Sequence, residues 1–190
     1  RADWDGAVRL CRYIKEDSLW AVLAALAVKH AELGTAEIAY AALEEVDKLR
    51  FVSSIKEIPS AEGRQAQLAL FQRRPQEAEN ILLQGGLVLR ALEMHMTLYN
   101  WERALEIALE RRTHIDTVLF QRQKHLEQTG RKETSEKFRQ VSGTIKVEAD
   151  KVTEKIAADR AKERERGGGA GSSSPAASHA AAAPAPAPAP

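Results

Sequence analysis

The chain has 190 residues and a formal net charge of +1, from 28 basic and 27 acidic side chains. This near-neutral charge gives no sign of a nucleic-acid or membrane partner, and the single cysteine, Cys11, excludes a disulfide within the chain. Aromatic residues make up only 5% of the sequence, which favours helices, because strands draw on aromatic and β-branched residues.

Residues that start and stop helices recur along residues 1–130. Asp3 can cap a first helix, and Ser18 a second, which contains the longest apolar run, LWAVLAALAV, and ends at Gly34. That run is about half of the ~20 residues that span a bilayer, so we expect a buried helix and no membrane insertion. Further helices are expected to begin at Thr35, Asp47, Ser60, Pro75, Leu87, Asn100 and Thr113, with stops at Pro59, Gly85-Gly86 and Gly130.

Four of these expected helices carry apolar or small residues at the same offsets, which lie along one helix face. Their starts are 31, 40 and 26 residues apart, against ~34 in a tetratricopeptide array, so the repeat looks degenerate. Short connections make successive helices antiparallel, which predicts an all-α, tetratricopeptide-like α-solenoid of stacked helical hairpins over residues 1–130. The residues that we expect to pack the hairpins are Trp4, Ala7, Trp101, Ala104, Leu105 and Ala108.

The pattern of residues 131–166 predicts one long, charged, amphipathic helix, whose apolar residues recur at a mean spacing of 3.6 residues and form one stripe. The stripe could dock on the solenoid as a cap or bind a partner helix, and Gly143 within it favours a kink or fraying. The tail, residues 167–190, has no large apolar side chains, so we expect it to be disordered. The candidate partner-docking residues are Phe138, Val141, Ile145, Val152 and Ile156.

The sequence offers only weak candidates for a catalytic, metal-binding or phosphate-binding site. His114 and Asp116 could both bind a metal, but residues i and i+2 point to different helix faces, and zinc needs three or four converging ligands. Thr113 fits better as a helix cap, with Asp116 three residues later. Gly85-Gly86 lacks the flanking strand and the Lys-Ser/Thr of a phosphate loop. We therefore expect no catalytic residue, metal, cofactor or small-molecule substrate.

The order of several segments resembles the C-terminal helical region of the intraflagellar transport protein 80 family. The segments are LYNWERALEIALERRTHIDTVLFQRQKHLE (98–127), LCRYIKEDSLWAVLAALAV (10–28), TAEIAYAALEEVDKLRFV (35–52) and PQEAENILLQGGLVLRALEM (75–94). The resemblance runs from about residue 4 to residue 166 and does not include the tail. In that family the helical region follows two WD-repeat propellers, which this chain lacks.

The resemblance implies a non-enzymatic scaffold subunit in the peripheral module of the intraflagellar transport B complex. Its implied partners are other subunits of that complex, with possible self-association, in trains that carry cargo along the cilium or flagellum. The implied locations are the cilium, the basal body and the cytoplasm. Two alternatives remain open: another solenoid adaptor, such as a peptide-binding tetratricopeptide module or a vesicle-coat component, and an enzyme or metal protein.

Overall fold

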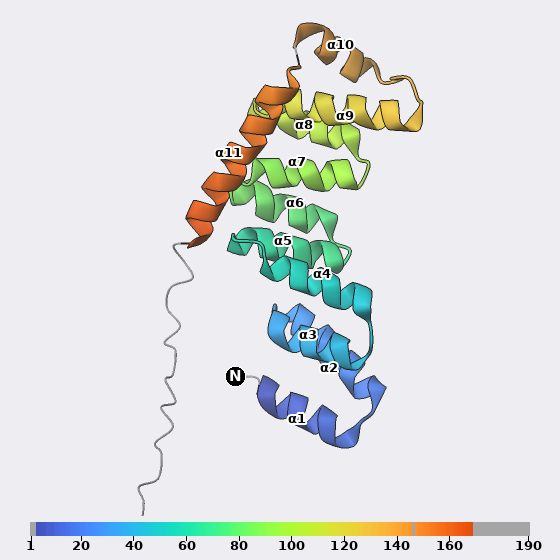
Figure 1. Cartoon of the computed structure of the whole chain (residues 1–190), viewed down its shortest axis with the longest axis vertical. Helices are drawn as coiled ribbons and strands as arrows, with labels where there is room; N and C mark the ends of the chain where they lie inside the picture. The colour runs from blue at the N-terminus through green and yellow to red at the C-terminus, as the bar shows by residue number, and fades with distance from the viewer. Residues whose placement is uncertain (1–2, 146, 169–190) are drawn as a thin grey trace, which may run out of the picture.

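The computed structural model describes residues 3–145 and 147–168, and these form eleven α-helices and no strand (Figure 1). The expected all-α solenoid is therefore confirmed. The predicted tail, residues 167–190, lies outside the described residues from position 169 onward. The helices are α1 (Trp4–Ile14), α2 (Asp17–Lys29), α3 (Leu33–Ala42), α4 (Val46–Lys56), α5 (Ala61–Phe71), α6 (Pro75–Gln84), α7 (Val88–Thr97), α8 (Trp101–Arg111), α9 (Ile115–Thr129), α10 (Glu136–Thr144) and α11 (Ala149–Gly168).

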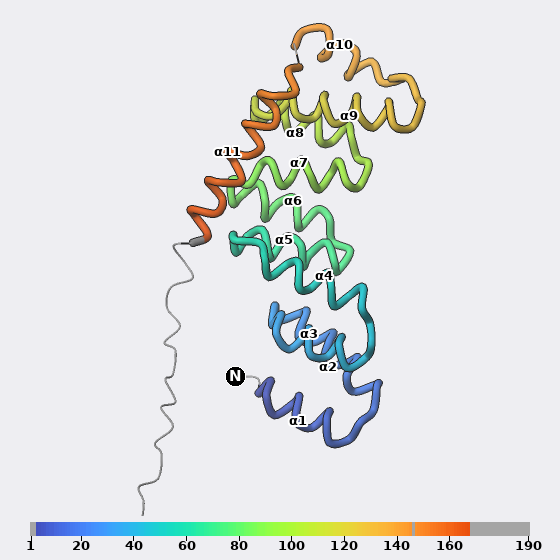
Figure 2. Tube along the Cα trace, in the orientation of Figure 1, coloured from blue at the N-terminus to red at the C-terminus, as the bar shows by residue number. Residues whose placement is uncertain are grey.

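The first nine helices form a ladder, in which each helix crosses the long axis of the molecule and the next one returns (Figure 2). Helix α10 lies at the far end of the ladder. Helix α11 then runs back along one edge, beside the ends of α5 to α9 (Figure 1). Most of the chain is thus a stack of antiparallel helices, and its last helix is a strap across that stack.

Most turns of the ladder share one design, in which a residue with positive φ follows the helix and the next residue caps the following helix. The amide of that capping residue donates to a carbonyl five residues earlier, as in Glu32 to Ala27 at 2.9 Å and Leu87 to Leu82 at 2.8 Å. These bonds satisfy the last carbonyls of the helix. The left-handed residues of this design are Ala31, Glu44, Arg73, Gly86 and Tyr99, and neighbours along the chain are mostly 13 residues apart. Arg112 begins a similar turn, but there the second residue after it, His114, caps the following helix.

A left-handed backbone is costly for residues other than glycine, so we expect Ala31→Gly to stabilise the chain. The φ of Ala31 is 59° and its side chain is exposed. Urea unfolding should show a gain of about 0.5–1 kcal/mol. The matched control is Ala25→Gly on the exposed face of α2, which should lose about 1 kcal/mol. Equal losses in both variants would contradict the turn assignment.

Local signals place many helix ends correctly. Ser60 occupies the position before α5, Pro75 begins α6, and Gly86 and Gly130 take left-handed conformations after α6 and α9. The predicted stop at Gly34 is wrong, because α2 ends at Lys29 and Gly34 lies inside α3.

Thr113 is also wrongly predicted to cap α9. The Thr113 amide closes α8 by donating to the Ala108 carbonyl, and His114, with φ of 58°, takes the capping position. Asp116 binds Lys155 instead of completing a capping box.

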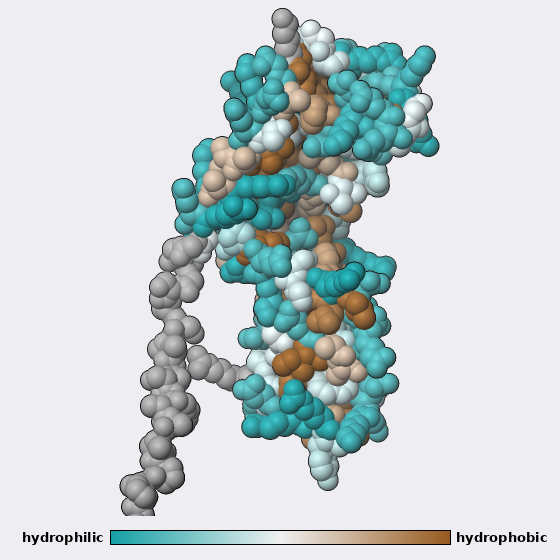
Figure 3. Space-filling view, viewed as in Figure 1, coloured by the Kyte–Doolittle hydropathy of each residue, from teal (hydrophilic) through white to brown (hydrophobic). Residues whose placement is uncertain are grey.

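Three apolar clusters form the core, within α1 to α5, α5 to α7 and α7 to α10. Alanine is common in all three, which lets neighbouring helices approach closely. Figure 3 shows apolar surface as a broken band along the long axis, between hydrophilic margins. The ladder therefore leaves apolar side chains at its surface. The buried alanines are Ala24, Ala27, Ala36, Ala39, Ala66, Ala69, Ala78, Ala91, Ala104 and Ala108.

Candidate functional site

The residues chosen to pack the hairpins lie in two of the core clusters. Ala104, Leu105 and Ala108 are at most 1% exposed, within the cluster that joins α7 to α10. Trp101 is half-buried against the same cluster, and its ring lies 5.3 Å from that of His125. Trp4 and Ala7 are half-buried too, against the cluster of α1 to α5.

The expected continuous helix over residues 131–166 is interrupted. Helix α10 ends at Thr144, and Ile145 is extended with φ of −119° and ψ of 122° before α11 begins. The break lies just after Gly143, where the sequence favours a kink. It lets α10 close the end of the ladder while α11 turns back along its edge (Figure 1).

The candidate docking stripe lies mostly against the chain itself. Phe138 is 3% exposed and Val152 is 1% exposed, so the expectation that these two side chains are open to a partner is not met. Val141 and Ile145 are partly buried against the α7–α10 cluster, and Ile156 is half-buried. Of the two roles left open by the sequence, these positions favour the internal cap.

The buried face of α11 continues beyond the apolar stripe as charged residues, which the sequence reasoning missed. Asp159 Oδ2 lies 2.6 Å from His114 Nε2, at the start of α9. Glu163 is only 6% exposed and accepts hydrogen bonds from Arg90 Nε at 2.6 Å and from the Ser60 hydroxyl. The signal was periodic: Ile156, Asp159 and Glu163 extend the same spacing of three and four residues.

Three further polar contacts hold α11 along its length. Lys155 Nζ lies 3.0 Å from Asp116, Arg160 pairs with Glu93 at 2.8 Å, and Arg166 donates to the Gly85 carbonyl at 3.1 Å. Ion pairs and hydrogen bonds therefore hold much of the strap. Salt should weaken those that are exposed to solvent.

Burial would raise the pKa of Asp159, but hydrogen bonds from His114 and Lys162 outweigh it and hold the pKa below its usual range. The ionised carboxylate thus stabilises the folded chain above the ordinary aspartate pKa. This stabilisation disappears as the pH falls through the lowered folded-state pKa.

An arrangement that resembles an acid–base relay runs from Thr117 through His114 to Asp159. Thr117 Oγ1 lies 3.2 Å from His114 Nδ1, and His114 Nε2 lies 2.6 Å from Asp159 Oδ2. A nucleophile must reach its substrate, yet Thr117 and His114 are each 1% exposed. A cavity of about 430 Å³ opens beside His114 and Asp159, and Thr117 does not line it. The line of side chains therefore fits a structural role, the fixing of α11 to α9.

His114 and Asp116 do not converge on a common point, since they bind Asp159 and Lys155 respectively. Across residues 3–145 and 147–168, no group of three or more His, Cys, Asp and Glu side chains could hold a metal ion. Among the same residues, no helix is both long and apolar enough to cross a bilayer.

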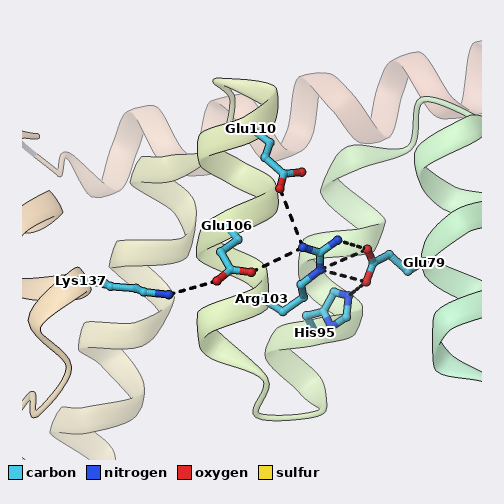
Figure 4. Close-up of polar contacts among 6 residues, drawn as sticks. All are labelled: Glu79, His95, Arg103, Glu106, Glu110 and Lys137. Atoms are coloured by element: carbon cyan, nitrogen blue, oxygen red, sulfur yellow. Dashed lines mark hydrogen bonds and ion pairs between the residues drawn. The ribbon is translucent and has the colours of Figure 1, made fainter.

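A second polar network ties α6, α7, α8 and α10 together (Figure 4). Glu79 accepts from Arg103 Nε at 3.2 Å and lies 2.8 Å from Nε2 of the buried His95. Arg103 also reaches Glu106, which pairs with Lys137 of α10 at 3.1 Å. The network links α10 to the helices two, three and four places before it.

Hydrogen bonds from Arg103 and, less strongly, His95 hold the pKa of Glu79 below its usual value of 4.5, against the effect of burial. Ionised Glu79 therefore stabilises the fold above pH 4.5, and this contribution is lost as the pH falls through the lower folded-state pKa. Glu79→Gln should cost about 1–2 kcal/mol in urea unfolding at pH 7, and less as the pH approaches ~3. The exposed Glu77→Gln should change stability by under ~0.5 kcal/mol. A constant loss for Glu79→Gln at every pH would contradict this account.

Comparison with known proteins matches this architecture. Residues 19–165 match the domain family described as the IFT80/172/WDR35/WDR19 TPR domain. The chain is 49% identical over 161 residues to the intraflagellar transport protein 80 homolog of Rattus norvegicus, and 48% identical over 161 residues to that of Mus musculus. Each match covers 85% of this chain and 21% of the relative.

A more distant relative is the intraflagellar transport protein 172 homolog of Mus musculus, which is 30% identical over 104 residues. That match covers 48% of this chain and 6% of the relative. The chain thus spans about a fifth of the length of its rat and mouse protein 80 relatives. By the extent of these matches, the chain belongs to the IFT80/172/WDR35/WDR19 family of tetratricopeptide-type helical domains.

Proposed function

We propose that the chain is a non-catalytic scaffold segment of an intraflagellar transport B complex, within its peripheral module. The observation that carries this proposal is the family match along residues 19–165, together with near 50% identity to two protein 80 relatives. The chain would act in the trains that move along the cilium or flagellum. It would also be present at the basal body and in the cytoplasm.

The structure supports a mechanical role for the segment. Three apolar clusters and the α10–α11 cap pack α1 to α9 against one another. A stack of this kind presents long surfaces to its neighbours, which here would be other subunits of the complex or a second copy of the chain. Val141, Ile145 and Ile156 remain half-buried, so we propose that partners touch the rim of the cap at these positions.

Crosslinking mass spectrometry on the assembled complex tests this function. A lysine-reactive reagent should join exposed lysines in or beside the cap, such as Lys132 between α9 and α10 and Lys151 in α11, to other subunits of the complex. Lys15, on the first turn of the ladder, reports whether the opposite end also meets a neighbour. A complex that assembles fully while the chain forms crosslinks only within itself would contradict the scaffold role.

A further inference from the structure

Three neighbouring hollows on the ladder have lining residues in common, and we consider them together as one candidate binding surface. The middle hollow, about 570 Å³, is lined by Phe51, Leu70, Phe71, Met94 and Leu98 among others. On one side it shares Phe71 with a hollow of about 550 Å³ that reaches α2 and α3. On the other side it shares Glu93 and Thr97 with a hollow of about 580 Å³ beside α9. We call the three together the long groove.

Aromatic side chains are concentrated in the long groove. The chain has four Phe, three Trp and three Tyr residues, and five of these ten line the groove. Phe71 stacks on Phe51 with ring centres 5.2 Å apart and meets Tyr40 edge-on at 6.2 Å. Large rings fixed in this way lose little conformational freedom on binding, so they are effective contact residues. The five are Tyr40, Phe51, Phe71, Tyr99 and Trp101.

Large apolar side chains face solvent in the middle hollow and in the hollow beside α9. Leu98 is 50% exposed and Tyr99 is 68% exposed. The Tyr99 ring is held 5.3 Å from that of His125, which also contacts Trp101. The backbone of Tyr99 has a φ of 57°, which is costly for a large side chain. Exposed apolar residues of this size are typical of surfaces that bind another protein.

The charge of the groove is strongly unbalanced, although the chain as a whole carries only +1. Its one acidic lining residue, Glu93, is already paired with Arg160 of α11. Within the part of the chain that the structure describes, Lys29, Arg73 and Lys124 form no ion pair. The basic lining residues are Lys29, Arg73, Arg74, Arg90 and Lys124. Two of these five are already paired with acidic residues outside the groove, Arg74 with Glu77 and Arg90 with Glu163.

We propose that the long groove binds an acidic segment of a partner protein that carries large apolar side chains. The aromatic and aliphatic walls would bury the partner's apolar side chains, and the basic rim would attract its carboxylates. Aliphatic walls from Leu70, Met94 and Leu98 favour a protein over a nucleic acid, whose bases need mainly flat aromatic platforms. This binding activity goes beyond the scaffold role and does not depend on it.

Fluorescence anisotropy with purified full chain tests the proposal. The probe is a labelled peptide of about 18 residues with Glu on one helical face and Leu and Phe on the other. We expect micromolar binding that weakens at least ~10-fold in the double variant Arg73→Glu, Lys124→Glu. The control Arg12→Glu, Lys132→Glu makes the same charge change at exposed positions outside the groove, and should bind within ~2-fold of the original chain.

A second pair of variants tests the apolar wall without touching charge. Leu98→Ser with Tyr99→Ser should weaken binding by ~5-fold or more at high salt, where ion pairs contribute least. Its control is Leu10→Ser with Tyr13→Ser on α1, where the same two residue types are 56% and 87% exposed outside the groove. All four positions are at the surface, so these variants should fold.

Four results would overturn the proposal. One is an equally tight complex with a peptide in which Lys replaces every Glu. Another is an equal loss of affinity in a groove variant and its control. The third is tighter binding of a single-stranded oligothymidine than of the acidic peptide. The last is no binding of the acidic peptide at about 1 mM, since a groove with this rim should retain it there.

Discussion

Ala104→Glu should lower the free energy of unfolding by about 3–5 kcal/mol, because it forces a charged side chain into a core with no room for it. Ala104 is 0% exposed and lies among Leu105, Ile107 and Ala108 of α8, against Leu92 and Val118 of the neighbouring helices. We expect thermal unfolding followed by circular dichroism to show a large drop in midpoint, or a chain that no longer unfolds cooperatively.

The matched control introduces the same glutamate into the same helix at an exposed position. Leu109 is 43% exposed, so Leu109→Glu should change stability by less than ~1 kcal/mol. If Ala104→Glu and Leu109→Glu unfolded at the same temperature as the unchanged protein, the close packing of α8 would be disproved.

Glu163→Gln should release α11 from the ladder, at a cost of about 3 kcal/mol in the stability of the docked strap. The change keeps the shape of the side chain but removes the charge that Arg90 contacts through two hydrogen bonds of 2.6 and 2.7 Å. Arg90 would then lack its anionic partner while only 25% exposed. Hydrogen–deuterium exchange should show faster exchange of α11 amides, with α1 to α4 unchanged.

The control for the strap is Glu165→Gln, an exposed residue on the same helix. Its exchange pattern should match that of the unchanged chain. If α11 stayed equally protected in Glu163→Gln, then Val152 and the other apolar contacts would be sufficient to hold the strap, and its polar face would be secondary.

The positions of most helices could be predicted from the sequence, because the residues that begin and end a helix act locally. Pro75 fixes a first turn, Ser60 precedes α5, and Gly86 and Gly130 adopt backbone angles that cost glycine little. The same local rules failed at Gly34, because α2 ends earlier, through a left-handed Ala31. Alanine is not a residue type that predicts a left-handed backbone.

The cap could not be predicted fully, because its arrangement depends on contacts distant in sequence. The apolar spacing of residues 131–166 predicts one continuous helix, but the helix is broken at Ile145, and Phe138 and Val152 are buried within the chain. Asp159 and Glu163 are not among the predicted docking residues. Only the positions of His114 and Arg90, 45 and 73 residues earlier, show that this face is buried.

The long groove could not be predicted from the sequence either. Its walls come from helices that are consecutive only in part, and residues such as Phe71 and Leu98 look like ordinary core positions. Regularly repeated Asn, Lys and Arg residues would have marked a peptide-binding module, whereas this groove is aromatic with a basic rim.

We propose that this chain acts through its packed helical architecture within intraflagellar transport. The most direct test replaces the corresponding segment of the mouse relative with residues 19–165 of this chain, in cells that lack the relative, and follows labelled trains along the cilium. The account predicts that the unchanged segment and Leu109→Glu restore train movement, and that Ala104→Glu does not. Equal restoration by Ala104→Glu, with its segment shown to be unfolded, would contradict the claim.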